Sequence, residues 1–552
     1  MSVTSLSVAT LGTPRIGPRR ELKFALEGFW AGKSSEQALL ETAAALRAAN
    51  WARQKSLGVT VIPSNDFSLY DQVLDTSAMV GAIPEVYGWK GGPVPLATYF
   101  AMARGAQGDA HDASCGHVHH DGTHGHGAPA QEMTKWFDTN YHYMVPEFHK
   151  DQIFQLASRK PIEEYQEARN LGYQTRPVLV GPVTFLKLGK SADPAFDPIT
   201  LLDRLIPVYV EVLRELAKRG AEWVQIDEPC LVLDLDDATR AALRHAYAEI
   251  AANVPDLKVM LATYFGALGD NLETALSLPV AGLHLDLKRA PEQLKPVLAG
   301  APKGLVLSLG VIDGRNVWRA DLAEVLDGLE PVVAGVGKDR VQIAPSCSML
   351  HVPIDLELED ALDADVKSWL AFSVQKIREL ATLATALAGD SAAVAASLAD
   401  FAKAANLRKT SPKIHSAAVA RRVEAIDDGM RRRINPFATR AEAQRSQFGL
   451  PRFPTTTIGS FPQTAEVRGA RAAHARGAMN DAQYEQFLKE ETARTVRWQE
   501  DIGLDVLVHG EFERNDMVQY FGEQLSGFTF TRHGWGQSYR RSCSAMSSGQ
   551  SR

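Results

Sequence analysis

A short basic stretch near the N-terminus carries residue types that recognise carboxylates. Arg20, Glu21, Leu22 and Lys23 follow one another after the apolar run Leu6–Gly12. The planar fork of arginine and the point charge of lysine suit a ligand with several carboxylates. A solvated helix start has the same composition, and position alone leaves both interpretations open.

A further cation, Lys135, lies in the aromatic-rich segment 132–143. Such a density of Trp and Tyr around one lysine is more typical of packing than of a site. The segment 111–126 contains six histidines together with Cys115, among Gly and Asp residues. Weak metal binding is conceivable there, but a glycine-rich stretch offers no rigid scaffold, which favours a flexible surface insertion.

Two groups farther along the chain could serve acid–base or nucleophilic chemistry. Asp227 and Glu228 are adjacent carboxylates after an apolar run, a pattern that suits a proton-transfer or ligand-binding pair. Cys347 could be a metal ligand or a nucleophile. A lone cysteine without a charged neighbour is more often simply buried.

Near the C-terminus, two short motifs could together hold both ends of an amino acid. The backbone N–H groups of Ile458, Gly459 and Ser460 could bind a carboxylate, because glycine permits close approach. The carboxylate of Glu511, in a His-Gly-Glu motif, could hold an amine. Each motif alone would be unremarkable.

The elements that position these residues are alternating apolar runs and amphipathic stretches. We expect eight strands, at Leu6–Gly12, Val59–Pro63, Val178–Pro182, Trp223–Asp227, Lys258–Thr263, Gly282–Asp286, Gly304–Leu309 and Val341–Pro345. We expect helices between them, including Ser35–Leu57, Leu201–Arg219, Asp237–Ala252, Leu322–Val333 and Asp360–Ala388. The alternation predicts an α/β fold, a (βα)8 TIM-type barrel, with its polar residues at the C-terminal ends of the strands.

An internal repeat indicates the start of a second, duplicated barrel. Gly12 and Gly58 are 46 residues apart, and Gly459 and Gly503 are 44 residues apart. Each second glycine is followed 13 residues later by an aspartate, Asp71 or Asp516. Matching order and spacing favour duplication, with new strands at Thr455–Gly459 and Asp505–Val508.

Composition narrows the class of protein. The chain has 552 residues, 45% of them hydrophobic and 23% charged, and a formal net charge of −7. This balance is typical of a globular protein and does not favour nucleic-acid or membrane partners. The four cysteines are far apart, as in reducing compartments. We therefore expect a soluble, cytoplasmic protein.

Several of these stretches together resemble the cobalamin-independent methionine synthase family. The resemblance runs in order from Leu11 to Tyr539, and it is carried by Arg20–Lys23, the Lys135 segment, Trp223–Pro229, Gly314–Asp321, Thr455–Thr464, Val508–Glu511 and Arg514–Met517. It implies two (βα)8 barrels and zinc-dependent methyl transfer from 5-methyltetrahydropteroyltriglutamate to L-homocysteine, by a monomer. It also implies that Arg20, Glu21, Leu22, Lys23 and Lys135 contact the folate, and that Ile458, Gly459, Ser460 and Glu511 hold homocysteine.

The resemblance also implies what this chain lacks. The family's zinc ligands and its proton-donating histidine lie in later strands of the second barrel, beyond the residues of this sequence. We therefore assign no metal ligand and no catalytic residue here, and we expect a C-terminally truncated chain with little activity of its own. The expected domains are a barrel over 1–388, a helical connector over 389–454, an incomplete catalytic barrel over 455–539 and an unstructured tail over 540–552.

Two other functions remain open at this point. A non-catalytic barrel that binds folate polyglutamate would need only the N-terminal residues. A metal-storage protein would depend on the histidine-rich segment 111–126.

Overall fold

The computed structural model describes residues 6–106, 127–514 and 516–535 of the chain. The chain divides into two compact units. The first unit comprises Met1–Lys409 and Phe530–Met546, and the second comprises Thr410–Thr529 and Ser547–Arg552. Among the described residues, no helix combines the length and the apolar character needed to cross a membrane.

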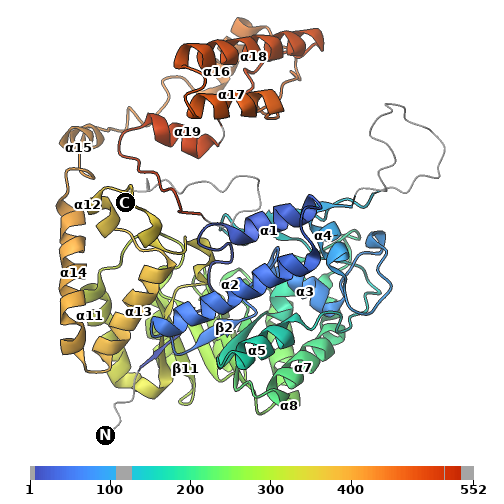
Figure 1. The fold of residues 1–552 in the computed structure, drawn as a ribbon, viewed down its shortest axis with the longest axis vertical. Helices are drawn as coiled ribbons and strands as arrows, with labels where there is room; N and C mark the ends of the chain where they lie inside the picture. Colours follow the sequence, from blue (N-terminus) through green and yellow to red (C-terminus); the bar gives the residue numbers. More distant parts are fainter. Residues whose placement is uncertain (1–5, 107–126, 515, 536–552) are drawn as a thin grey trace. The chain divides into compact units, whose positions relative to one another are not determined.

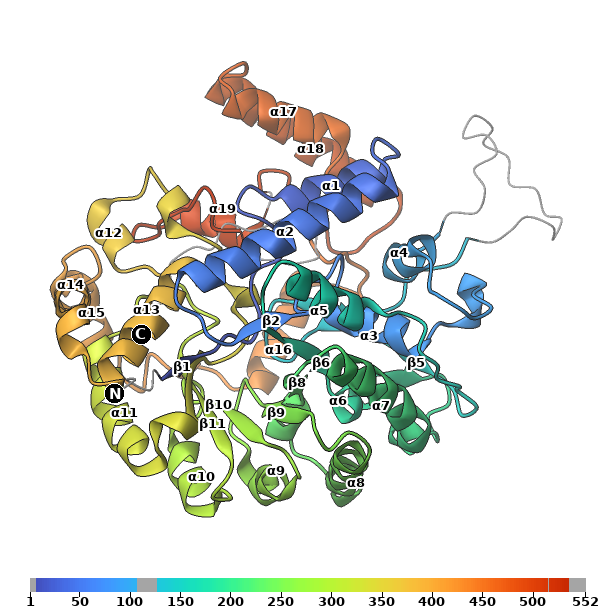
Figure 2. The same ribbon diagram turned by 60° about the horizontal axis from the view of Figure 1, so that its bottom comes forward.

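The first unit is built on one parallel sheet of eight strands (Figures 1 and 2). Their spatial order is β1 (Ser7–Val8), β12 (Val341–Pro345), β11 (Val306–Ile312), β10 (Gly282–Asp286), β9 (Lys258–Ala262), β8 (Trp223–Asp227), β6 (Thr175–Val180) and β2 (Ile62–Ser64). A parallel bridge between Ala9 and Val61 joins the two outermost strands. The sheet therefore closes on itself, and every strand predicted for this part of the chain is confirmed.

Helices cover the outer face of this sheet, as Figure 2 shows for the segments around β8 to β11. Both faces of a strand are then buried, which is why all five residues of β10 are inaccessible. The α-helices of this part of the chain, whether or not they cover the sheet, are α1 (Glu21–Trp30), α2 (Glu36–Ser56), α3 (Gln72–Val80), α4 (Leu96–Arg104), α5 (Lys160–Asn170), α6 (Pro182–Leu188), α7 (Leu202–Lys218), α8 (Asp237–Asn253), α9 (Leu272–Ser277), α10 (Leu294–Gly300), α11 (Leu322–Val336), α12 (Ala364–Ser368), α13 (Ser373–Leu387) and α14 (Ser391–Thr410). Two small sheets stand apart, β3 (Met133–Lys135) with β4 (His142–Met144), and β5 (Glu147–Phe148) with β7 (Lys190–Ser191).

The single long helix predicted over Asp360–Ala388 is wrong. The structure has the short helix α12, an extended segment and then α13. The extended segment pairs with another part of the chain, since Trp318 and Leu370 form an antiparallel bridge and Ala371 N donates to Val317 O at 2.8 Å. Backbone groups used in this pairing cannot also form a helix ladder, so the tertiary contact overrides the helical periodicity.

The second unit contains mainly helices: α15 (Ala417–Glu424), α16 (Phe437–Phe448), α17 (Ala465–Ala475), α18 (Asp481–Asp501) and α19 (Met517–Gln524). The strands predicted at Thr455–Gly459 and Asp505–Val508 do not form regular strands. Their pairing is reduced to a parallel bridge between Ser460 and Gly510 and a few backbone hydrogen bonds, such as Val506 N to Thr455 O at 3.0 Å. Within the described part of this unit no third strand flanks the pair, and a lone pair of strands is marginal.

The two units nevertheless begin with matching local structure. Helices α2 and α18 each have 21 residues, and their first residues are 445 positions apart. Val61 N donates to Val8 O at 3.0 Å, as Val506 N does to Thr455 O. Asp71 caps α3 and Asp516 caps α19, again 445 positions apart. The long helix, the aspartate cap and one backbone hydrogen bond therefore recur in both units.

Candidate functional site

The motifs at the start of the second unit converge on one side chain, Glu511. Ser460 Oγ donates a hydrogen bond to Glu511 Oε2, although 51 positions separate the two residues. Glu511 also forms an ion pair with Arg514, whose Nη2 lies 3.4 Å from Ser460 Oγ. Gly459 has a φ of +119°, and a Cβ built there would lie 3.0 Å from Glu511 Oε1. A side chain at position 459 would therefore crowd the carboxylate.

The backbone of this site is held by the strand remnants on either side. The Ser460–Gly510 bridge and the hydrogen bond from Phe461 N to Gly510 O, at 3.0 Å, bring the two motifs together. Glu511 itself has a left-handed backbone, with a φ of 59°. Ile458 is 99% exposed, but its predicted role is through the backbone N–H group, on which side-chain exposure does not bear. The contacts above join the other three residues predicted to hold an amino acid, Gly459, Ser460 and Glu511.

The predicted carboxylate-binding stretch lies at the start of α1 in the first unit. Arg20 precedes the helix with a φ of 66°, and its guanidinium lies 3.9 Å from the centre of the Trp535 ring. Glu21 Oε2 accepts a hydrogen bond from Arg19 N at 3.0 Å. Lys23 lies 3.8 Å from Glu27, a weak exposed pair. These cations are accessible to an anionic ligand.

Leu22 and Lys135 occupy contrasting positions. The Leu22 side chain is only 2% exposed and belongs to an apolar cluster, so only its backbone could contact a ligand. Lys135 is exposed on the β3–β4 hairpin, opposite His142. Among the described residues it forms no ion pair, so its charge is available. Its neighbour Trp136 is buried, which accounts for part of the aromatic density seen in the sequence.

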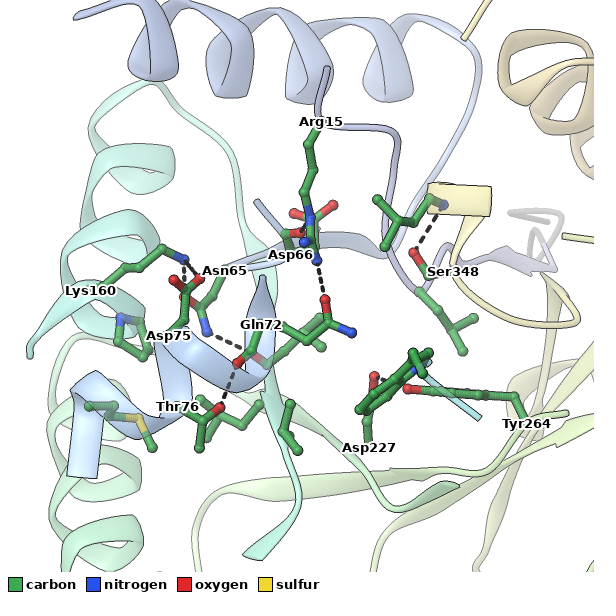
Figure 3. Close-up of a pocket in the computed structure, with 18 of the residues that line it drawn as sticks. Arg15, Asn65, Asp66, Gln72, Asp75, Thr76, Lys160, Asp227, Tyr264 and Ser348 are labelled. Atoms are coloured by element: carbon green, nitrogen blue, oxygen red, sulfur yellow. Dashed lines mark hydrogen bonds and ion pairs between the residues drawn. The ribbon is translucent and has the colours of Figure 1, made fainter. Parts of the chain in front are cut away.

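The adjacent carboxylates Asp227 and Glu228 face different surroundings. Asp227 and Tyr264 line a cavity at the carboxyl end of the sheet (Figure 3). Asp227 accepts hydrogen bonds from Tyr264 Oη at 2.9 Å and from Gln225 Nε2 at 2.7 Å. Glu228 is buried and accepts from the backbone N–H groups of Val183 and Thr184 in the first turn of α6. Burial raises the pKa of each to about 7. They do not act as a pair, because Glu228 caps a helix.

The cavity contains two cations that sequence inspection did not single out. Arg15 donates to Tyr141 Oη, Gln72 Oε1 and the backbone oxygen of Asp66. Lys160, at the start of α5, donates to Asn65 Oδ1 at 2.8 Å and lies 3.2 Å from Asp75. Arg15 could have been found from its position just after the first strand. The local sequence around Lys160 shows only its pairing with Glu164, four residues later. Its partners in the cavity, Asn65 and Asp75, are about 90 positions away in the sequence.

The remaining candidates are Cys347 and the histidine-rich segment, of which the structure describes only Cys347. Cys347 is fully buried, and burial raises the pKa of its thiol well above the usual range. No group of three or more His, Cys, Asp or Glu side chains within the described ranges could hold a metal ion. The histidine-rich segment 111–126 lies outside the described residues, as do Cys115 and Cys543.

The closed parallel sheet and the polar side chains at the carboxyl ends of its strands define an α/β-barrel protein of the kind that carries enzyme sites on this face. The chain belongs to the cobalamin-independent methionine synthase family. Residues 7–337 match the family described as "Cobalamin-independent synthase, N-terminal domain", and residues 453–548 match "Cobalamin-independent synthase, Catalytic domain".

Relatives at high identity support the same assignment. The chain is 72% identical over 536 residues to a protein of Nitrobacter winogradskyi named "5-methyltetrahydropteroyltriglutamate--homocysteine methyltransferase". The matched region covers 97% of this chain and 70% of that protein. A protein of the same name from Bradyrhizobium diazoefficiens is 69% identical, over 98% of this chain and 69% of that one. One from Caulobacter vibrioides is 62% identical over 98% of this chain and 69% of its own length.

Proposed function

We propose that this chain serves methyl transfer from 5-methyltetrahydropteroyltriglutamate to L-homocysteine, as the names of its relatives state for them. The observation that carries the proposal is the 72% identity across 97% of the chain. Both family descriptions match in order, which favours a methyltransferase over a folate-binding barrel without catalysis. We further propose that the second unit corresponds to the opening of a duplicated barrel, because its first strand–helix segment repeats the hydrogen bonds of the first unit.

In this proposal the first unit binds the folate substrate. Arg20 and Lys23 would pair with carboxylates of the glutamate tail, and Lys135 would supply a third cation. Arg20 is suited to this because Trp535 covers a face of its guanidinium and leaves the planar N–H edge to donate. Glu21 would act indirectly, since its carboxylate holds the backbone of Arg19 at the start of α1.

The second unit would bind homocysteine through both ends of the amino acid. The ammonium group would lie against Glu511, and the backbone N–H groups around Gly459 and Ser460 would hold the carboxylate. Arg514 now neutralises Glu511, so the incoming ammonium must replace the guanidinium. The released Arg514 would remain close enough to pair with the substrate carboxylate, since it already reaches Ser460 Oγ.

Zinc, which the family resemblance predicts, does not fit the residues that the structure describes. A zinc site needs several ligating side chains around one point, and no group of three or more His, Cys, Asp or Glu side chains among the described residues provides it. Burial raises the thiol pKa of Cys230 and Cys347, and Glu228 raises that of Cys230 further. No step through zinc follows from these residues, and zinc dependence stays a prediction to be tested by metal analysis of the purified chain.

The test is a binding and turnover measurement on the purified chain. We expect Glu511→Gln to weaken L-homocysteine binding at least tenfold by calorimetry, because an amide cannot pair with the ammonium. The matched control is Glu513→Gln, which removes a nearby carboxylate that reaches only His509, at 3.8 Å. Equal binding by both variants would overturn the assignment of Glu511.

The folate end is tested separately. Arg20→Ala should weaken binding of 5-methyltetrahydropteroyltriglutamate about tenfold, whereas Lys33→Ala, at an exposed lysine after the same helix, should not. The loss should shrink for a monoglutamate, which has fewer carboxylates to bind. A loss of the same size for both folates would contradict tail recognition by Arg20.

A further inference from the structure

The cavity at the carboxyl end of the first unit's sheet has no role in the proposed methyl transfer. Its charged lining consists of Asp66, Asp75, Asp227, Arg15 and Lys160 (Figure 3). The cavity has a volume of about 50 Å³, which is room for roughly four waters. A ligand of about five or six non-hydrogen atoms is therefore the size that fits.

The charged side chains of this cavity differ in whether they have a partner of opposite charge. Arg15 and Lys160 are held by several acceptors each, and Lys160 takes up the charge of Asp75 at 3.2 Å. Asp227 accepts only from the neutral groups of Gln225 and Tyr264, and in the described part of the chain it forms no ion pair.

Asp66 is the second carboxylate without a cation directly on it. Its Oδ2 accepts from the backbone N–H and the hydroxyl of Thr13, at 2.9 and 3.1 Å. Arg15 binds the backbone oxygen of Asp66 rather than its carboxylate. Burial raises the pKa of both Asp66 and Asp227, and this effect outweighs the opposing charges of Arg15 near Asp66 and of Arg176 near Asp227.

The position of Asp66 repeats that of Glu511 in the second unit. Asp66 precedes Glu511 by 445 positions, the same spacing that relates α2 to α18. Thr13 donates its hydroxyl to Asp66, as Ser460 donates to Glu511. The first unit therefore retains a hydroxyl-supported carboxylate at the place where the second unit is proposed to hold an ammonium group.

The carboxylate-binding half of that arrangement is absent from the first unit. The backbone N–H of Thr13 is already used by Asp66. Ser348 Oγ occupies the space beside Gly12, where it would lie 2.5 Å from a Cβ. The carboxylate of an amino acid therefore could not be bound by the Thr13 N–H beside Gly12. An amine without a carboxylate does not need this N–H.

The uncharged walls suit a cation with a short apolar chain. Three aromatic residues, Trp136, Tyr264 and Phe265, line the cavity together with Met79 and Leu350. Aromatic faces attract organic cations, and the apolar side chains would receive the carbon chain. We propose that this cavity binds a small primary alkylammonium ion, with its nitrogen between Asp66 and Asp227. The analogy with Glu511 rests on the proposed function, whereas the cavity and its charges do not.

The experiment uses 3-(methylthio)propylamine, which is methionine without its carboxylate, and calorimetry on the full chain. The matched probe is 3-(methylthio)propan-1-ol, which has the same chain and no charge. We expect the unsubstituted chain to bind the amine at least tenfold more tightly than it binds the alcohol. We also expect the Glu511→Gln chain to bind the amine more tightly than it binds L-methionine. Binding of amine and alcohol with equal affinity would overturn the proposal without any variant of the cavity.

Variants then place the site. Asp227→Asn, which keeps an acceptor for Tyr264, should weaken amine binding at least tenfold, and Asp66→Asn should do the same. Glu511→Gln should leave amine binding unchanged, whatever its effect on homocysteine, so the two proposals fail independently. Amine binding that is lost in Glu511→Gln but kept in both cavity variants would overturn the assignment to the first unit.

Discussion

The opening segments of the two units share their local structure and differ in their surroundings. Asp66 and Glu511 both follow the second strand position and both accept from a hydroxyl near the first. In the first unit Asp66 is partly buried beside the closed sheet, and its removal from water raises its pKa. In the second unit Glu511 is neutralised by Arg514. The comparison teaches that a repeated sequence reproduces hydrogen-bond geometry, whereas the neighbouring elements decide the electrostatics.

The apolar side chains show the same contrast. Eight-stranded closure buries β10 and the inner faces of its neighbours completely. In the second unit, Ile458, Phe453 and Phe437 are 99%, 80% and 73% exposed. Replacing a residue that makes a given kind of contact should therefore lower the free energy of unfolding more in the first unit than in the second.

Buried arginines should give the largest difference. Arg176 is 2% exposed inside the sheet, where it donates to Gln342 and Gln225 at 3.1 Å. Arg176→Ala should destabilise the first unit by about 3 kcal/mol, because it leaves a cavity and unpaired amide oxygens. In the second unit, the partly buried Arg471 donates to Gln463 Oε1 and to the backbone oxygen of Phe512, and Arg471→Ala should cost about 1 kcal/mol. Hydrogen exchange of β8 and α17 amides measures each cost locally, and equal costs would break the comparison.

The two equivalent aspartate caps come next. Asp71 is 0% exposed and accepts from Val73 N, Leu74 N and Met144 N. Asp71→Ala should destabilise the first unit by about 2 kcal/mol, since three buried donors lose their acceptor. Asp516→Ala, at the partly exposed cap of α19, should cost below about 1 kcal/mol. A larger loss for Asp516 would show that burial does not set the difference.

The pH dependence of Asp227 tests the electrostatic side of the comparison. Burial raises the pKa of Asp227 from 3.8 to about 7. The folded state therefore holds this proton more tightly than the unfolded state does, and the free energy of unfolding falls as pH rises from about 4 to about 7. Asp227→Asn removes the titration and should be more stable than the unsubstituted protein at pH 8, by about 2 kcal/mol, but not at pH 4. Thermal unfolding of both proteins across this range gives the measurement. A constant difference would contradict the raised pKa.

The smallest contrast should come from the exposed caps of the matching long helices. Ser35 Oγ accepts from Ala38 N at 3.2 Å at the start of α2, and Asn480 Oδ1 accepts from Gln483 N at 2.9 Å at the start of α18. Ser35→Ala and Asn480→Ala should each cost about 1 kcal/mol, because both caps lie on the surface and depend only on local geometry. Unequal costs in hydrogen exchange of the first helical turns would show that surroundings act here too.

Much of the fold and part of the site could be predicted from the sequence. Strand Trp223–Asp227 was predicted with its observed bounds, because a five-residue apolar run ending in carboxylates is a local pattern. Two motifs that follow neighbouring predicted strands, Ile458–Ser460 and Glu511, were expected to act together, and Ser460 does donate to Glu511. The break in the predicted helix Asp360–Ala388 was invisible, because it depends on pairing with residues 317–319.

The sequence by itself determined the alternation of strands and helices, the helix caps and the positions of the charged motifs, all of which depend on contacts between near neighbours. Only the tertiary structure decided that the Asp227 side chain lines a cavity, whereas the adjacent Glu228 side chain accepts hydrogen bonds from the first turn of α6. It also decided that Lys160 takes up the charge of Asp75. Closing the sheet brings distant positions together in a medium of low dielectric constant. Burial and counter-charges, which set each pKa there, belong to the assembled fold.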